Sequence, residues 1–136
     1  MSDENVEIVQ RVVNATNRRD PDGFVAALSP DVEWEDNLFG TEGARTYRGA
    51  AEVREWLSEV WEPWATLHME ALGITPAPDD RVLVEFELTA RGKESGAETH
   101  ARFWTVTQIA DGKIRTRQTF PDRAEALEAA GLADAE

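Results

Sequence analysis

Two charged residues, Asp36 and Arg117, stand where the sequence could place acid–base chemistry in a sheltered site. Asp36 ends the segment Asp31–Asp36, in which Val32 and Trp34 alternate with glutamates. Because two apolar residues at alternate positions indicate the inward face of a strand, we expect Asp36 to point inward as well. A carboxylate sheltered from water can take a proton from the carbon beside a carbonyl group. Asp36 is therefore predicted as a general base, and the alternative is a polar cap of the following turn.

Arg117 lies in a second predicted strand, Lys113–Phe120, whose alternation places Arg115, Arg117 and Thr119 on one face. If that face lines a pocket, the buried guanidinium needs a carboxylate from the protein or from a ligand. Arg117 would then anchor a carboxylate or enolate and could pair with Asp36. The alternative is a solvated face, because a slip of one residue in register reverses every side chain of a strand.

Aromatic and hydroxyl residues near these charges are predicted to bind substrate. An enclosed apolar site with few polar groups suits a hydrophobic molecule that bears an oxygen. Tryptophans at helical spacing usually belong to a core, so we expect one or two of them at the pocket wall. The predicted substrate-binding residues are Trp34, Trp56, Val60, Phe103, Thr105 and Thr119.

Metal and nucleotide chemistry find no support in the residue pattern. The chain has no cysteine, and His68 and His100 have no partner at a metal-ligand spacing. No glycine-rich phosphate loop or nucleophile elbow occurs. We therefore expect no metal and no cofactor. The net charge of −13 disfavours nucleic acid and anionic membranes as partners.

Length and hydropathy favour one domain over residues 1–136. A hydrophobic content of 41% is enough for a core, and the apolar runs are too short to span a membrane. The first ten residues, MSDENVEIVQ, lack the basic and apolar regions of a signal peptide. We expect a cytoplasmic protein.

The elements that position the candidate residues follow from hydrophobic periodicity. Helices are predicted at Asn5–Arg19, from Pro21 to a stop at Ser29-Pro30, at Ala50–Glu62 and after the N-cap Asp122. Strands are predicted at Asp31–Asp36, Leu67–Thr75, Arg81–Arg91, Glu98–Ile109 and Lys113–Phe120, with Asn37–Gly49 as a long loop. This order predicts an α+β architecture, with helices over one face of a curved, mostly antiparallel sheet.

Three short motifs at matching places resemble SnoaL-like proteins. They are Asp31-Val32 at the first strand, Tyr47-Arg48-Gly49 before the third helix, and Asp111-Gly112-Lys113-Ile114 at the last hairpin. SnoaL-like proteins belong to the nuclear-transport-factor-2-like (NTF2-like) superfamily, together with polyketide cyclases and ketosteroid isomerases. The resemblance covers nearly the whole chain. It implies a cone-shaped fold in which a curved, mixed, mostly antiparallel sheet wraps around helices and encloses a pocket.

The resemblance to ketosteroid isomerases gives Asp36 a role. In those enzymes a Glu-Asp pair ends the first strand and its Asp shuttles the proton, and here Glu35-Asp36 stands at that place. Their oxyanion-hole residues, a Tyr and a protonated Asp, correspond to apolar Val12 or Val13 and to Thr105. The resemblance therefore supports a base at Asp36 and argues against steroid isomerisation.

The resemblance to SnoaL-type cyclases concerns the last strand. Their pocket-facing His and Asp correspond to Arg117 and Thr119, which supply neither an acid nor a base of that kind. One reading is a cofactor-free isomerase, cyclase or hydrolase with Asp36 as the base. The other is a non-catalytic ligand-binding or dimerisation module. Trp104 and Val106 on the outer sheet face favour a homodimer formed through that face.

Overall fold

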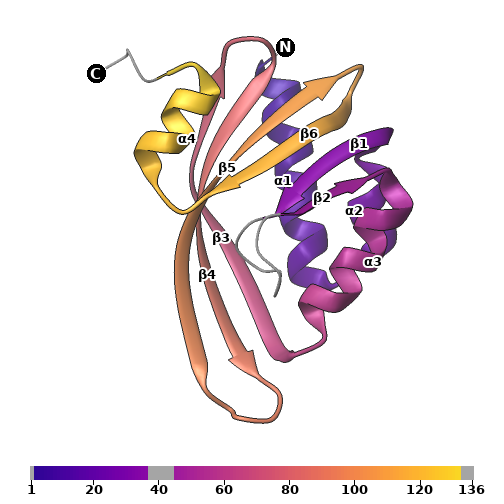
Figure 1. The fold of residues 1–136 in the computed structure, drawn as a ribbon, viewed down its shortest axis with the longest axis vertical. Helices are drawn as coiled ribbons and strands as arrows, with labels where there is room; N and C mark the ends of the chain where they lie inside the picture. Colours follow the sequence, from indigo (N-terminus) through magenta and orange to yellow (C-terminus); the bar gives the residue numbers. More distant parts are fainter. Residues whose placement is uncertain (1, 37–44, 133–136) are drawn as a thin grey trace.

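The structure, a computed structural model, describes residues 2–36 and 45–132. The strands form one sheet in the order β2-β1-β6-β5-β4-β3. Only the β1–β6 pair is parallel, and the other neighbouring strands run antiparallel. In chain order (Figure 1), the elements are α1 (Ser2–Arg18), α2 (Pro21–Ala26), β1 (Leu28–Asp36), β2 (Arg45–Arg48), α3 (Ala50–Trp61), β3 (Trp64–Ala77), β4 (Arg81–Gly92), β5 (Glu98–Ala110), β6 (Lys113–Phe120) and α4 (Arg123–Ala130).

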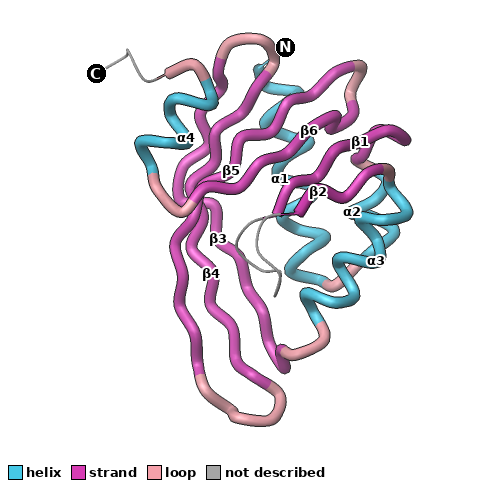
Figure 2. Tube along the Cα trace, in the orientation of Figure 1, coloured by secondary structure: helices cyan, strands magenta, loops and turns pink. Residues whose placement is uncertain are grey.

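The helices divide between the two sides of the sheet. Helices α1, α2 and α3 lie on one side and α4 lies on the other, as Figure 2 shows. This arrangement confirms the predicted α+β class and the mixed, mostly antiparallel sheet. None of the helices in the described part of the chain has the length and hydropathy to cross a membrane.

Side-chain alternation along the strands sets the main core. Alternate residues of β4 are buried: Val82, Val84, Phe86, Leu88 and Ala90. They pack in one cluster with apolar side chains of α1, α2 and α3. Burying this apolar face of the sheet under three helices is the main force that holds the two layers together.

Side-chain caps fix the ends of the short helices. The Asp20 carboxylate accepts a hydrogen bond from the Gly23 amide, and Pro21 occupies the first position of α2. Asp122 accepts hydrogen bonds from the amides of Ala124 and Glu125 at the start of α4. An aspartate at the N-cap satisfies amides that have no partner within the helix, and the Asp122 cap confirms the sequence prediction.

A β-bulge at Arg115 changes the predicted faces of β6. Ile114 pairs with Ile109 and Thr116 with Gln108, so Arg115 is an extra residue in its strand. Arg115 is exposed and lies 3.7 Å from the carboxylate of Asp31, whereas Arg117 is buried. The prediction that Arg115 and Arg117 share a face was wrong, because a bulge shifts the alternation by one residue.

Two boundaries also differ from the prediction. Strand β1 begins at Leu28, so Ser29 and Pro30 lie in the strand instead of ending a helix. The predicted loop contains the short strand β2, which pairs with β1 through Tyr47 opposite Trp34. Residues 37–44 of that loop lie outside the described residues.

The outer face of the sheet is partly covered by α4. Val106 is only 3% exposed and packs with Leu83, Ala126 and Ala130 in a second apolar cluster. Trp104 is half-buried at the margin of the same cluster. Val106 lies on the outer face as predicted, but the last helix of the same chain covers it, so it offers no exposed apolar surface to a second copy. The homodimer stays a prediction.

Asn17 fastens helix α1 to the edge strand β3. Its side-chain Nδ2 donates to the carbonyl oxygen of Met69 at 2.9 Å, and its Oδ1 accepts from the Met69 amide at 2.8 Å. The two residues are 52 positions apart in the chain. The Asn17 amide thus pairs with the open edge of the sheet as a neighbouring strand would, and it fixes where α1 lies.

We predict that Asn17→Ala lowers the free energy of unfolding by about 1–2 kcal/mol, because two backbone groups of Met69 lose their partner. Asn14→Ala on the exposed side of the same helix is the matched control. Both substitutions have the same effect on helix propensity, so only the Asn17 variant should lose stability in urea unfolding. Equal stability of the two variants would show that the Asn17 contact is not stabilising.

Candidate functional site

A pocket that is partly open to solvent lies between the helices and the sheet. Its wall is almost wholly apolar, and its one charged side chain among the described residues belongs to Arg117. The lining residues are Val9, Val12, Val13 and Thr16 of α1, Phe24 of α2, Trp34 of β1, Trp56, Leu57, Val60 and Trp61 of α3, Leu67 and Met69 of β3, Phe86 and Leu88 of β4, Thr105 and Thr107 of β5, and Ile114 and Arg117 of β6.

Most of the predicted site residues lie at this pocket. Those on its wall are Trp34, Trp56, Val60, Thr105 and Arg117. Phe103 and Thr119 are buried but are not among the lining residues, and Phe103 stacks on Phe86 with ring centroids 5.3 Å apart. The structure therefore brings five of the eight predicted residues to one wall, and their contact with a ligand stays a prediction.

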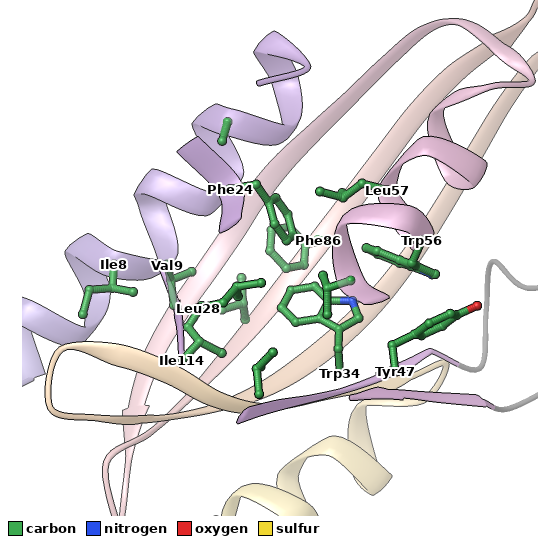
Figure 3. Close-up of a cluster of buried hydrophobic side chains, with 14 of the residues drawn as sticks. Ile8, Val9, Phe24, Leu28, Trp34, Tyr47, Trp56, Leu57, Phe86 and Ile114 are labelled. Atoms are coloured by element: carbon green, nitrogen blue, oxygen red, sulfur yellow. The ribbon is translucent and has the colours of Figure 1, made fainter. Parts of the chain in front are cut away.

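Aromatic rings form one end of the pocket (Figure 3). The ring of Trp34 projects from β1 and contacts Phe24 edge-on at 5.2 Å between centroids. On its other side lies Trp56 of α3, at 5.5 Å, and Tyr47 of β2 packs against Trp56 at 6.2 Å. Phe24, Trp34 and Trp56 line the pocket, and aromatic rings on an apolar wall are typical of a site for a flat apolar molecule.

Asp36 is buried beside this aromatic group. It is 1% exposed, which confirms the inward orientation expected from Val32 and Trp34. Its Oδ2 accepts a hydrogen bond from the indole Nε1 of Trp56 at 2.9 Å. Asp36 is not itself among the lining residues, so it adjoins the pocket through Trp56. Burial of a carboxylate is costly unless it accepts hydrogen bonds or lies near positive charge.

Arg117 supplies that charge from the neighbouring strand. It is 6% exposed, and its Nη1 donates to the backbone carbonyl oxygen of Glu35 at 2.8 Å. Trp34 and Arg117 are register partners in the parallel β1–β6 pair, which explains why the guanidinium carbon lies 4.3 Å from the Trp34 ring centroid. The same carbon lies 5.4 Å from the Trp56 ring centroid. The guanidinium is thus held over two indole faces, a favourable cation–π arrangement.

The electrostatics leave Arg117 charged at neutral pH. Burial lowers the pKa of Arg117 to about 10, and the nearby negative charges of Asp36 and Glu35 oppose that shift. This attraction supports the hypothesis that Asp36 and Arg117 lie in one buried site. Within the part of the chain that the structure describes, the Nη1 of Arg117 donates to the backbone carbonyl oxygen of Glu35.

Sequence reasoning missed some features of the wall. Thr107 lies on the same face of β5 as Thr105, so strand alternation could have identified it. Leu67 and Met69 lie on the edge strand β3, three places from β6 in the sheet, and only the tertiary fold brings them to the pocket. The indole N–H of Trp34 has no hydrogen-bond partner among the described residues, which no sequence pattern could indicate. No cluster of three or more metal-ligating side chains occurs in residues 2–36 and 45–132.

Comparison with protein families gives one match over most of the chain. The model of the SnoaL-like domain family matches residues 9–117. No curated protein matches the chain.

Solved structures with the same fold extend this comparison. An NTF2-like protein of unknown function from Burkholderia pseudomallei K96243 is 25% identical, with a TM-score of 0.76 over 93% of this chain and 97% of that one. A protein with a ketosteroid isomerase-like fold from Catenulispora acidiphila, in complex with trimethylamine, is 18% identical, with a TM-score of 0.75 over 93% of each chain. TerC, co-crystallised with polyporic acid, is 22% identical, with a TM-score of 0.75 over 93% and 97%. These likenesses confirm the predicted NTF2-like fold.

The attraction between Asp36 and Arg117 generates a prediction about stability. Arg117→Met removes the cation and leaves a buried carboxylate, so we expect the free energy of unfolding to fall by about 2 kcal/mol or more. The same substitution should cost less when Asp36→Asn has already removed the negative charge. Urea unfolding of the four proteins should give a coupling of about 1–3 kcal/mol between the two sites.

Arg115→Met is the matched control for this cycle, because it removes an exposed arginine from the same strand. Its effect should stay within about 0.5 kcal/mol. Strictly additive effects of Arg117→Met and Asp36→Asn would mean that the two charges do not share a site.

Proposed function

The chain belongs to the SnoaL-like domain family, and from this premise we propose that it binds a hydrophobic, oxygen-bearing small molecule in the pocket. The observation that carries the proposal is the buried guanidinium of Arg117 on an otherwise apolar wall. A cation is costly to bury, and the guanidinium carries five N–H groups, of which Nη1 donates to the Glu35 carbonyl oxygen. A ligand oxygen beside Arg117 would accept a hydrogen bond from another N–H of the guanidinium.

The residues of the wall support a ligand that is flat and mainly apolar and that bears an oxygen. Aromatic rings on α3 and β1 offer flat apolar surface, and the hydroxyl groups of Thr105 and Thr107 lie on the strand that pairs with β6. A few polar groups in an apolar cavity orient a ligand while the apolar area supplies affinity. Two structural neighbours, crystallised with trimethylamine and with polyporic acid, support small-molecule binding in this fold.

Cofactor-free catalysis with Asp36 as the general base is the more specific form of this proposal. The Asp36 carboxylate would take a proton from the carbon beside the ligand's carbonyl group. The resulting enolate oxygen would be stabilised by Arg117 and Thr105, and the proton would return at the same or another carbon. Isomerisation and cyclisation both begin with such a step. Trp56 supports this role because its indole N–H fixes one oxygen of the carboxylate.

The alternative is a ligand-binding or dimerisation module that performs no chemistry. It is supported by the position of Asp36, which adjoins the wall but does not line it. Binding and turnover therefore need separate tests.

The binding proposal predicts that 2-acetylnaphthalene, a flat apolar ketone, binds the protein and that Arg117→Gln weakens binding by about tenfold. This is the loss expected when a ketone oxygen no longer accepts a charge-assisted hydrogen bond. Isothermal titration calorimetry measures the dissociation constants. Arg115→Gln is the control and should bind as the wild type does, because Arg115 is exposed and outside the pocket.

The pH dependence of that binding follows from the charge of Arg117. The pKa of Arg117 is about 10, so the guanidinium is protonated below that pH and loses its charge above it. The affinity for this ketone, which does not itself ionise, should be constant from about pH 6 to about pH 9 and fall as the pH passes about 10. A loss of affinity near neutral pH would assign the oxygen anchor to another group.

The catalytic proposal predicts exchange of the methyl protons of 2-acetylnaphthalene in deuterated water. A base at the pocket removes one α-proton and returns a deuteron, so the methyl signal in the proton NMR spectrum should disappear faster than in buffer alone. Asp36→Asn should abolish the acceleration while leaving binding measurable. Binding without accelerated exchange in the wild type would favour the non-catalytic module.

A further inference from the structure

The indole N–H of Trp34 is a donor that the protein does not use. Trp34 is 3% exposed, it lies on the wall of the pocket, and its Nε1 has no hydrogen-bond partner among the described residues. Buried polar groups in folded proteins almost always have a partner. A buried N–H left without an acceptor at the wall of a cavity therefore indicates that something in the cavity accepts from it.

The neighbouring tryptophans show that this feature is specific to Trp34. The indole N–H of Trp56, on the same wall, donates to Asp36. Trp104 also has a buried Nε1 without a partner in the described part of the chain, but it lies on the outer side of the sheet beside α4. Trp34 alone of these three combines an unused N–H with a place at this pocket.

The unused donor lies beside the one cation of the wall. The guanidinium carbon of Arg117 is 4.3 Å from the Trp34 ring centroid, and the two residues are register partners on adjacent strands. Around this guanidinium lie the Glu35 carbonyl oxygen, which accepts a hydrogen bond from Nη1, two indole faces and the nearby negative charge of Asp36. A guanidinium carries five N–H groups. Trp34 and Arg117 thus bring donors to the same corner of the pocket.

The two strongest polar groups at this corner are donors, and the weaker hydroxyl of Thr107, the register partner of Arg117, can donate or accept. An indole N–H and a guanidinium have no acceptor, and no aspartate or glutamate is among the described lining residues. An amine would meet a like charge, and an alcohol would bring a hydrogen for which these two groups offer no acceptor. A delocalised oxyanion has only acceptors and carries the opposite charge, so it matches both groups.

We infer that Trp34 and Arg117 together form a two-donor site that selects ligands with an anionic oxygen group, a carboxylate or an enolate, on a flat apolar body. The inference rests on the proposed binding function and adds the ligand's charge state. Trp34 is then a specificity-determining residue: its N–H discriminates a bare oxygen acceptor from a hydroxyl or an amine.

Two probes with the same ring system test this selectivity. They are 2-naphthoate, which ends in a carboxylate, and 2-naphthylmethanol, which ends in a neutral hydroxyl group. Calorimetry on the wild type should give naphthoate an affinity about tenfold or more above that of naphthylmethanol. Trp34→Phe keeps an aromatic ring but lacks the N–H, so it should weaken naphthoate by about tenfold and naphthylmethanol by less than about threefold.

A second measurement uses the wild-type protein and does not depend on how well the variant folds. In nitrogen–proton NMR spectra each indole N–H gives its own signal, and the spectra of Trp34→Phe and Trp104→Phe identify two of them by their loss. Naphthoate should move the Trp34 indole proton signal strongly downfield, as expected for a new hydrogen bond to an anion. The Trp104 signal is the matched control and should stay in place.

The outcomes separate this inference from the proposed function. Equal affinity of the wild type for the two probes, with an unmoved Trp34 signal, would overturn the two-donor site and leave ligand binding in the pocket intact. Selective naphthoate binding that survives Trp34→Phe would assign the selectivity to Arg117 alone and overturn the role of Trp34. Failure of naphthoate, naphthylmethanol and 2-acetylnaphthalene to bind would contradict the proposed binding function as well.

Discussion

The burial of one guanidinium determines how the interior of this protein is arranged. A charge inside an apolar core is unfavourable unless polar and aromatic groups replace the water it loses. Around Arg117 these groups are a backbone carbonyl, two indole faces and the negative charge of Asp36. They come from strand β1 and helix α3, so the cation on β6 ties the sheet to the helical layer. The chain has a net charge of −13, so the buried positive charge of Arg117 is opposite in sign to the charge of the protein as a whole.

The position of that cation depends on the backbone of β6. The bulge at Arg115 changes the alternation in the strand, so Ile114 and Arg117 both reach the pocket while Arg115 points to solvent. The parallel pairing with β1 then sets Trp34 beside Arg117. Two features of the sheet, one irregular and one regular, therefore place a cation against an aromatic ring. Neither feature requires any unusual residue, which is why a wall of this kind can change its chemistry by substitution alone.

Much of this arrangement was predictable from local patterns, and the remainder was not. Hydrophobic periodicity placed α1, α3 and the long strands, and the alternation of Val32 and Trp34 correctly turned Asp36 inward. Periodicity could not separate Arg115 from Arg117, because a bulge leaves no mark in the pattern of residue types. It also missed β2, a strand of only four residues. Whether the indole N–H of Trp34 finds an acceptor depends on the positions of residues that are distant in the sequence. Only the tertiary fold gives those positions.

The parallel pairing of β1 with β6 has a consequence for how the pocket comes into being. The hydrogen bond between Arg117 and Glu35 joins residues 82 positions apart, and the three long antiparallel strands lie between them in the chain. Contacts of such separation carry a high entropic cost of loop closure and tend to form late in folding. The wall of the pocket combines residues of β3, β4 and β5 with residues of β1, β6 and three helices, so the pocket is complete only when all of these elements have assembled. Ligand capture is thus tied to completion of the whole fold, and a bound molecule would protect the protein against global unfolding more than against local fraying.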